Sequence, residues 1–291
     1  MIVRSGVRCL ALLGCIAALA ATQAAVAAAH EGEYAKFNYC PSTTSEVFKC
    51  IYSVTEGGDV VLGKKTVPIV NPVILQGGFA KPSKETKLSK FFEATNGVTL
   101  SKTPQPVPGG LLGIVPPEHS SWLVKKLSAF FFENKLTGVN ATLELAKPAS
   151  EIKLSESHLV AEEKLALELP VKVHLENPFL GKNCYVGSSS SPLIWKLTTG
   201  ETSPPAPNSP IHGGAGEVEF LDEGRILELA GGELVDNAWS APTASGCGGI
   251  LSFLVNPIIN SQIGLASAAG HNAAVLKTTT YVASVKSVNE H

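Results

Sequence analysis

The chain is poor in charge, and two charged residue types are nearly missing. Charged residues make up only 16% of its 291 residues. Outside residues 1–29, Arg225 is the only arginine, and Asp59, Asp222 and Asp236 are the only aspartates. Setting those 29 residues aside removes two of the 23 bases, which leaves 21 against 25 acids and a net charge of −4. One guanidinium on an acidic chain excludes a nucleic-acid-binding surface.

Several motifs that carry chemistry are missing as well. No two cysteines have the C-x₂₋₄-C spacing of a zinc site, and no G-x-S-x-G nucleophile motif is present. What is abundant is apolar and turn-forming: 44% hydrophobic residues, 27 glycines and 19 prolines. This composition is too apolar for a disordered chain and too rich in turn formers for a helical bundle.

The first 29 residues are typical of a secretory signal peptide. Arg4 and Arg8 precede an uncharged, alanine-rich run, which ends in small residues suited to cleavage near Ala27–Ala29. Two alternatives remain open, an uncleaved N-terminal anchor and a lipoprotein modified at Cys15. No later run is long enough to span a membrane as a helix. We therefore expect a secreted, extracellular protein that is not an integral membrane protein after cleavage.

Four cysteines remain beyond the leader, and they allow three pairings. Export to an oxidising compartment favours two disulfides. Cys40 and Cys50 enclose a short loop, so a local bond is expected between them. The remaining pair, Cys184 and Cys247, would join segments that are far apart in sequence.

Alternation of apolar and polar residues predicts a mainly β fold. The clearest case is residues 165–175, where every odd position is apolar and Pro170 is expected to confine the strand to an edge or a bulge. A second clean alternation covers 139–145. Shorter strands are expected at 47–54, 59–62, 67–75, 193–198, 217–221, 226–229, 250–255 and 274–285. About ten strands with short turns indicate a β-sandwich or an open barrel. We expect a single domain over 30–291, with two lobes hinged near 198–214 as the alternative.

One segment has a helical period. Apolar residues between 118 and 135 fall on one stripe, which predicts an amphipathic helix there, and a weaker helix is expected near 155–164. An unusually apolar loop, residues 106–117, precedes the first helix.

Several short strings resemble a group of exported proteins of high-GC Gram-positive bacteria. They include the residues 107–114 (VPGGLLGI), 177–185 (NPFLGKNCY), 197–200 (LTTG), 246–249 (GCGG) and 267–272 (SAAGHN). The resemblance implies a secreted protein with a signal peptide. It supplies no activity, substrate or catalytic residue.

Isolated polar pairs offer only weak chemistry. His174 and Glu176 share one face of a strand, as metal ligands can, and Glu217 and Glu219 share another, as paired carboxylates of a glycosidase can. No third ligand and no aromatic sugar platform accompany them, so solvated strand faces are favoured. The serines at 188–191 fit a turn. We assign no catalytic residue, no metal and no cofactor.

The best functional candidate is therefore the apolar segment 106–136. Leu111, Leu112, Ile114, Trp122 and Phe132 form a candidate apolar binding surface for a lipid or another cell-envelope component, unless the segment packs into the protein's own core. The expected function is non-catalytic binding or structure. The alternative is a secreted hydrolase whose site is assembled from distant loops around His174, His212 or His271.

Overall fold

A computed structural model describes residues 29–110 and 138–291, and in these residues the chain is mainly β. The strands are β1 (Lys49–Leu62), β2 (Lys65–Pro68), β3 (Val73–Phe79), β4 (Ser89–Phe92), β5 (Pro104–Pro106), β6 (Asn140–Leu145), β7 (Lys153–Leu154), β8 (Leu167–Glu176), β9 (Tyr185–Val186), β10 (Leu193–Leu197), β11 (Glu217–Leu221), β12 (Ile226–Asp236), β13 (Ala244–Ser245) and β14 (Ala273–Ser284). The helices are α2 (Glu156–Ala161), α3 (Ser252–Ile263) and α4 (Val285–Asn289), with 3₁₀ turns η1 (Gly32–Phe37), η2 (Ala149–Glu151), η3 (Asp222–Gly224) and η4 (Gly249–Leu251).

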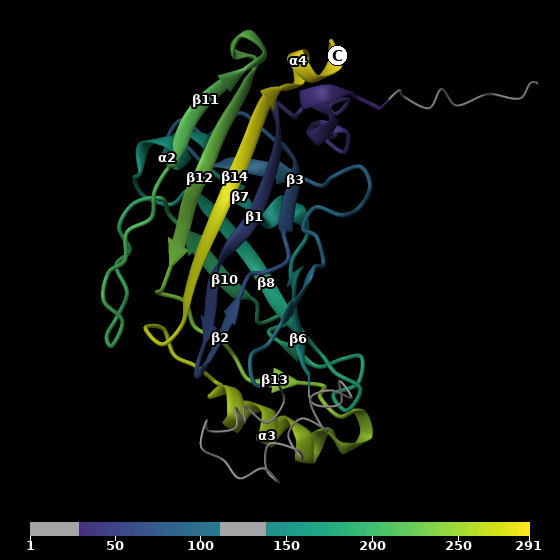
Figure 1. The fold of residues 1–291 in the computed structure, drawn as a ribbon, viewed down its shortest axis with the longest axis vertical. Coiled ribbons are helices and arrows are strands. Elements are labelled where there is room, and N and C mark those ends of the chain that lie inside the picture. The colour runs from purple at the N-terminus through teal and green to yellow at the C-terminus, as the bar shows by residue number, and fades with distance from the viewer. Residues whose placement is uncertain (1–28, 111–137) are drawn as a thin grey trace, which may run out of the picture.

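All strand pairs are antiparallel, and together they make one sheet that folds back on itself. One layer has the order β11-β12-β14-β1-β3, with β2 beside β1. Strand β4 pairs with β3 at one end and with β7 at the other, so it forms the corner to a second layer built around β8. Figure 1 shows the two layers crossing, with α3 at the lower end. The predicted mainly β fold, a sandwich or open barrel, is confirmed.

Along both long edges the layers approach each other without completing a ladder. Thr198 and Val235 exchange two backbone hydrogen bonds, of 3.0 and 2.8 Å, between β10 and β12. At the other edge the side chain of Gln105 in β5 accepts hydrogen bonds from the backbone N–H groups of Val70 and Asn71, each at 3.0 Å. These few bonds hold the edges together, although the sheet does not close into a barrel.

Two predicted strands, 47–54 and 59–62, are one long strand. β1 runs through Gly57 and Gly58, where its register against β14 shifts by a bulge. The bulge lets β1 bend and continue along both β3 and β2.

The expectation that Pro170 places its strand at an edge is wrong. β8 is an interior strand, with β6 and β7 on one side and β9 and β10 on the other. Pro170 falls between the residues paired with β7 and those paired with β6, so its missing N–H lies where no ladder bond is required. Its carbonyl still accepts a hydrogen bond from Ala146.

The strand expected at 250–255 is also wrong, because these residues belong to η4 and α3. The helix expected near 155–164 is confirmed as the short α2, whose first turn is capped by the hydroxyl of Ser155. The helix predicted over 118–135 lies outside the described residues. So do residues 1–28 of the expected leader and the candidate residues Leu111, Leu112, Ile114, Trp122 and Phe132.

Both expected disulfides are present. Cys40 bonds to Cys50, and Cys184, directly before β9, bonds to Cys247, shortly after β13. Within residues 29–110 and 138–291, no helix is long and apolar enough to cross a membrane.

Candidate functional site

The two layers enclose an apolar cavity. Its volume is about 120 Å³. A single water needs roughly 10–15 Å³ of such space and two to four polar partners. The cavity is therefore larger than a single water needs, and the chemistry of its walls determines which kind of molecule it can hold.

Those walls are made by side chains that alternate inward along the strands. Leu62, Val67, Leu75 and Leu276 come from the first layer, and Leu143, Leu169, Val173 and Leu175 come from the second. The strict alternation of β8 places three of these residues on one face, as the sequence predicts. α3 closes one end with Ile259 and Ile263.

Few polar groups reach the cavity. Lys65 is the one charged residue among its described lining residues, and Gln105 and Gln262 also contribute to the lining. Ser53 lines the wall as well, but its hydroxyl is already bonded to that of Thr280 at 2.7 Å. Such walls offer few partners for ordered water.

One buried donor in the wall is unused. Trp195, on β10, is 1% exposed and lines the cavity. Its indole Nε1–H donates no hydrogen bond to any atom of the described chain. A buried donor normally has an acceptor, so this indole N–H is an exception among the described residues.

Comparisons with protein-family models, with curated proteins and with solved structures found no match to this chain. The functional argument therefore depends on the geometry of the site. Val107 and Gly110, at the start of the predicted segment 106–136, line the cavity, whereas the candidate residues of that segment lie outside the described residues. Most other lining residues come from strands and from α3, and alternation along a strand does not show which strands face each other across the cavity.

His174 is held in a polar cluster on the opposite face of β8. Its Nδ1 lies 3.7 Å from Glu144 and 3.9 Å from Glu176, and its ring stacks on Tyr185 at 4.4 Å. Burial, and then the nearby Glu144 carboxylate, raise the pKa of Tyr185. Lys172 also pairs with Glu144, at 3.3 Å. In the described ranges no three potential ligands gather around a metal position.

The other predicted groups lie apart. His212 is exposed and 3.9 Å from Glu162, and His271 is exposed in another loop. Among the described residues, no hydrogen bond or ion pair joins His174, His212 or His271 to one another. Glu217 and Glu219 are exposed on the edge strand β11. The serines at 188–191 form a turn, in which Ser188 accepts from the N–H of Ser191 at 3.1 Å.

A second, more open pocket is polar and contains Asp236. Burial raises the pKa of this carboxyl, although its two oxygens accept backbone N–H bonds from Lys196 at 2.6 Å and from Ala238 at 2.9 Å. One oxygen thus binds β10 and the other binds the turn after β12, which is a structural role.

Proposed function

We propose that this protein is an exported, non-catalytic binding protein that takes a long apolar chain, such as the acyl chain of a lipid, into the cavity between its layers. The observation that carries the proposal is the aliphatic wall of that cavity, in which Lys65 is the one charge among the described lining residues. Export is supported by the leader-like residues 1–29 and is compatible with two disulfides.

Filling the cavity with an apolar group is more favourable in free energy than leaving it empty. An unfilled cavity costs on the order of 24 cal/mol per Å³ in lost packing, so about 120 Å³ corresponds to roughly 3 kcal/mol. That is a large share of the roughly 5–15 kcal/mol that stabilises a typical domain. Water recovers little of it, because most of the wall has no hydrogen-bonding groups.

The polar groups in the cavity wall indicate how a ligand would be oriented inside it. Lys65 belongs to the β1–β2 hairpin, which contacts the C-terminal end of α3 through the 2.7 Å bond from Lys64 N–H to the carbonyl of Ile263. A carboxylate or phosphate is the natural partner of this ammonium group.

Binding of a dansyl-labelled fatty acid tests the proposal. The wild type should enhance its fluorescence saturably, whereas Ala141→Leu, which adds a side chain into the cavity, should weaken binding about tenfold or more. Ala146→Leu is a matched control, since Ala146 is similarly buried (8% against 9% exposed) but does not line the cavity.

Thermal melts of each variant show whether it is folded. If a folded Ala141→Leu protein binds the probe as tightly as the wild type, the cavity is not the binding site. If the wild type itself shows no saturable binding, the proposed function is wrong.

A further inference from the structure

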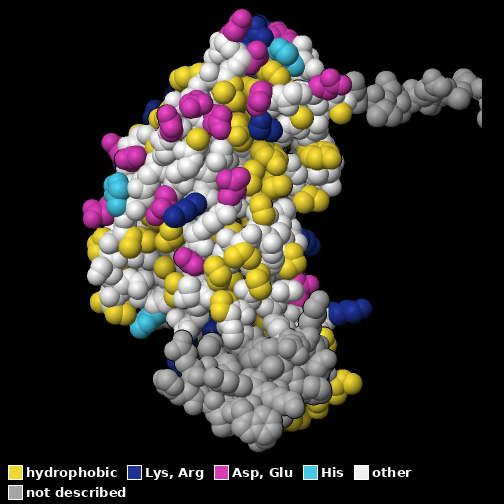
Figure 2. Space-filling view, in the orientation of Figure 1, with side chains coloured by type: hydrophobic (Ala, Val, Ile, Leu, Met, Phe, Trp, Pro, Cys, Tyr) yellow, Lys and Arg dark blue, Asp and Glu magenta, His cyan; other side chains and the backbone are white. Residues whose placement is uncertain are grey.

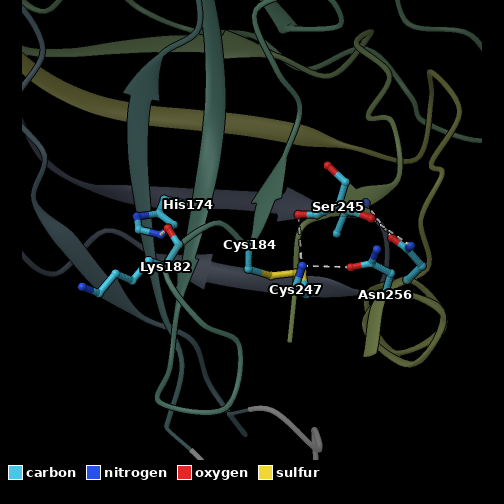
Figure 3. The surroundings of a disulfide bond; sticks show 8 residues. His174, Lys182, Cys184, Ser245, Cys247 and Asn256 are labelled. Atoms are coloured by element: carbon cyan, nitrogen blue, oxygen red, sulfur yellow. Dashed lines mark hydrogen bonds between the residues drawn. A yellow bond between two sulfur atoms is a disulfide. The ribbon is translucent and has the colours of Figure 1, made fainter. Parts of the chain in front are cut away.

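Helix α3 is apolar on two opposite faces, and among the described residues only one of them is buried against the rest of the fold. On the inner face Ile259 is 4% exposed, and the side chains of Asn256 and Asn260 bind the preceding segment. Asn256 accepts from the N–H of Cys247 at 2.9 Å, and Asn260 accepts from the N–H of Ala244 at 2.6 Å. Figure 3 shows Asn256 directed at Cys247, beside the Cys184–Cys247 disulfide.

The outer face carries large side chains in water. The outer stripe consists of Ile250, in the 3₁₀ turn η4 that leads into α3, and of Phe253, Leu254 and Ile258 in α3, and these residues are 96%, 70%, 54% and 55% exposed. Their spacing of three and four residues places them on one side of the helix. Because the asparagines and Ile259 already anchor α3, the fold does not need these side chains.

The described segments next to the outer stripe carry either no charged side chain or only lysines. No lysine, arginine, aspartate or glutamate occurs between Asp236 and Lys277. The two loops that meet the ends of α3, residues 62–65 and 177–182, carry Lys64, Lys65 and Lys182 and no acid. Both contacts are direct, because Lys64 donates to Ile263 and Gly248 donates to Leu180, each at 2.7 Å.

On the face drawn in Figure 2, the acidic side chains of the described residues lie mostly over the upper half of the molecule, whereas Figure 1 places α3 at the lower end. At one end of the molecule, this acidic protein thus presents an apolar stripe that is flanked by lysines. Phe179, 61% exposed in the loop 177–182, adds to this apolar surface.

We propose that the outer stripe docks on a lipid surface containing anionic headgroups. The apolar side chains enter the boundary between headgroups and acyl chains, and Lys64 and Lys182 lie at the level of the phosphates, as in interfacial amphipathic helices. The described segments 237–276, 62–65 and 177–182 contain no acid, which lowers the repulsion that an anionic surface would otherwise exert on this acidic protein.

This inference deepens the proposed function, because a ligand that is insoluble in water must be collected from or delivered to a membrane. The inner face of the same helix lines the cavity with Ile259 and Ile263. Docking would therefore place the end of the cavity closed by α3 directly over the lipid. Docking itself does not require an occupied cavity, so the two proposals fail independently.

Flotation with vesicles tests docking. Vesicles of phosphatidylcholine with phosphatidylglycerol should carry the wild type, and phosphatidylcholine alone should carry it less. Phe253→Ser with Leu254→Ser should lower partitioning about tenfold or more, since it removes two anchors. Lys64→Gln with Lys182→Gln should lower it about fivefold per lysine on anionic vesicles and little on neutral ones.

The matched control is Phe220→Ser with Val218→Ser. These residues are 68% and 42% exposed on β11, at the opposite end of the molecule in Figure 1, and should not affect flotation. Docking by the outer stripe is contradicted if the Phe253/Leu254 variant floats like the wild type, or if the β11 variant is impaired equally. Docking is also contradicted if the wild-type protein is a dimer and the Phe253/Leu254 variant is a monomer that floats like the wild type. Ala141→Leu should float normally, which separates docking from cavity binding.

Discussion

Two adjacent glycines in β1 differ sharply in what they tolerate. Gly58 has a φ of +101°, and a Cβ there would lie 1.9 Å from the carbonyl oxygen of Val275. A Cβ on Gly57 would meet nothing closer than 3.9 Å. Gly58→Ala should therefore destabilise the protein by about 2–4 kcal/mol, through a left-handed backbone and a clash with backbone atoms. Gly57→Ala should stay within about 1 kcal/mol of the wild type. Urea unfolding of both variants measures the difference, and equal stabilities would show that the bulge is not constrained.

Tyr34 gives stability a pH dependence in the alkaline range. Its hydroxyl donates to Asp222 at 2.7 Å, and burial, together with this carboxylate, raises the pKa of Tyr34 from 10.0 to about 12. The unfolded chain then loses its tyrosine proton first, so this contribution is complete below pH 10 and decreases as pH rises toward 12. Tyr34→Phe should cost about 1 kcal/mol at neutral pH, and its deficit should narrow above pH 10.

Urea unfolding at neutral pH and near pH 11 checks this dependence. Tyr39→Phe, on a ring that is 46% exposed, controls for the loss of a hydroxyl. If Tyr34→Phe lowers the free energy of unfolding by the same amount at both pH values, the role of the Tyr34–Asp222 bond is contradicted.

At the scale of elements, the two disulfides should contribute unequally. Cys184–Cys247 spans 63 residues and Cys40–Cys50 spans 10. The chain-entropy model then gives about 4 kcal/mol for the first and about 3 kcal/mol for the second. Replacing each pair by alanine and unfolding the proteins in urea tests the order. A larger loss for the short loop would mean that native packing around Cys40 and Cys50 outweighs loop entropy.

The elements that sequence predicts best are those whose alternation is complete. β6 and β8 appear where apolar residues recur every second position, because each has one face in the core. The error at α3 has a physical cause. A short apolar run such as 250–255 has no period that separates strand from helix, and what decides it is the tertiary bonds of Asn256 and Asn260.

The candidate site was harder to predict than the fold. Its walls combine β1, β3, β6, β8 and β14, and which strands face each other depends on the corner at β4 rather than on any local motif. Pro170 shows the same limit. Its effect on β8 depends on a gap between β6 and β7 that only the assembled sheet reveals.

At the scale of the whole molecule, the two ends of the sandwich have separate cores. A small cluster of Tyr34, Phe37, Val47, Ile226 and Val288 packs η1 against α4 at the upper end, where Figure 1 places the C-terminus. The large cluster, the cavity and α3 occupy the rest. No residue is shared between the two clusters, so changes in them should act independently.

This separation predicts opposite effects for two variants. Val288→Ala, at a side chain that is fully buried in the small cluster, should cost about 2 kcal/mol of stability and leave the affinity for the dansyl-labelled fatty acid unchanged. Ala141→Leu should weaken the probe's binding while the stability changes by less, because the added carbons enter existing space rather than a packed core. Urea unfolding and probe titration on both single variants and the double variant measure this. If Val288→Ala also weakens binding, the upper end is coupled to the cavity, and the sandwich behaves as one cooperative unit in binding as well as in folding.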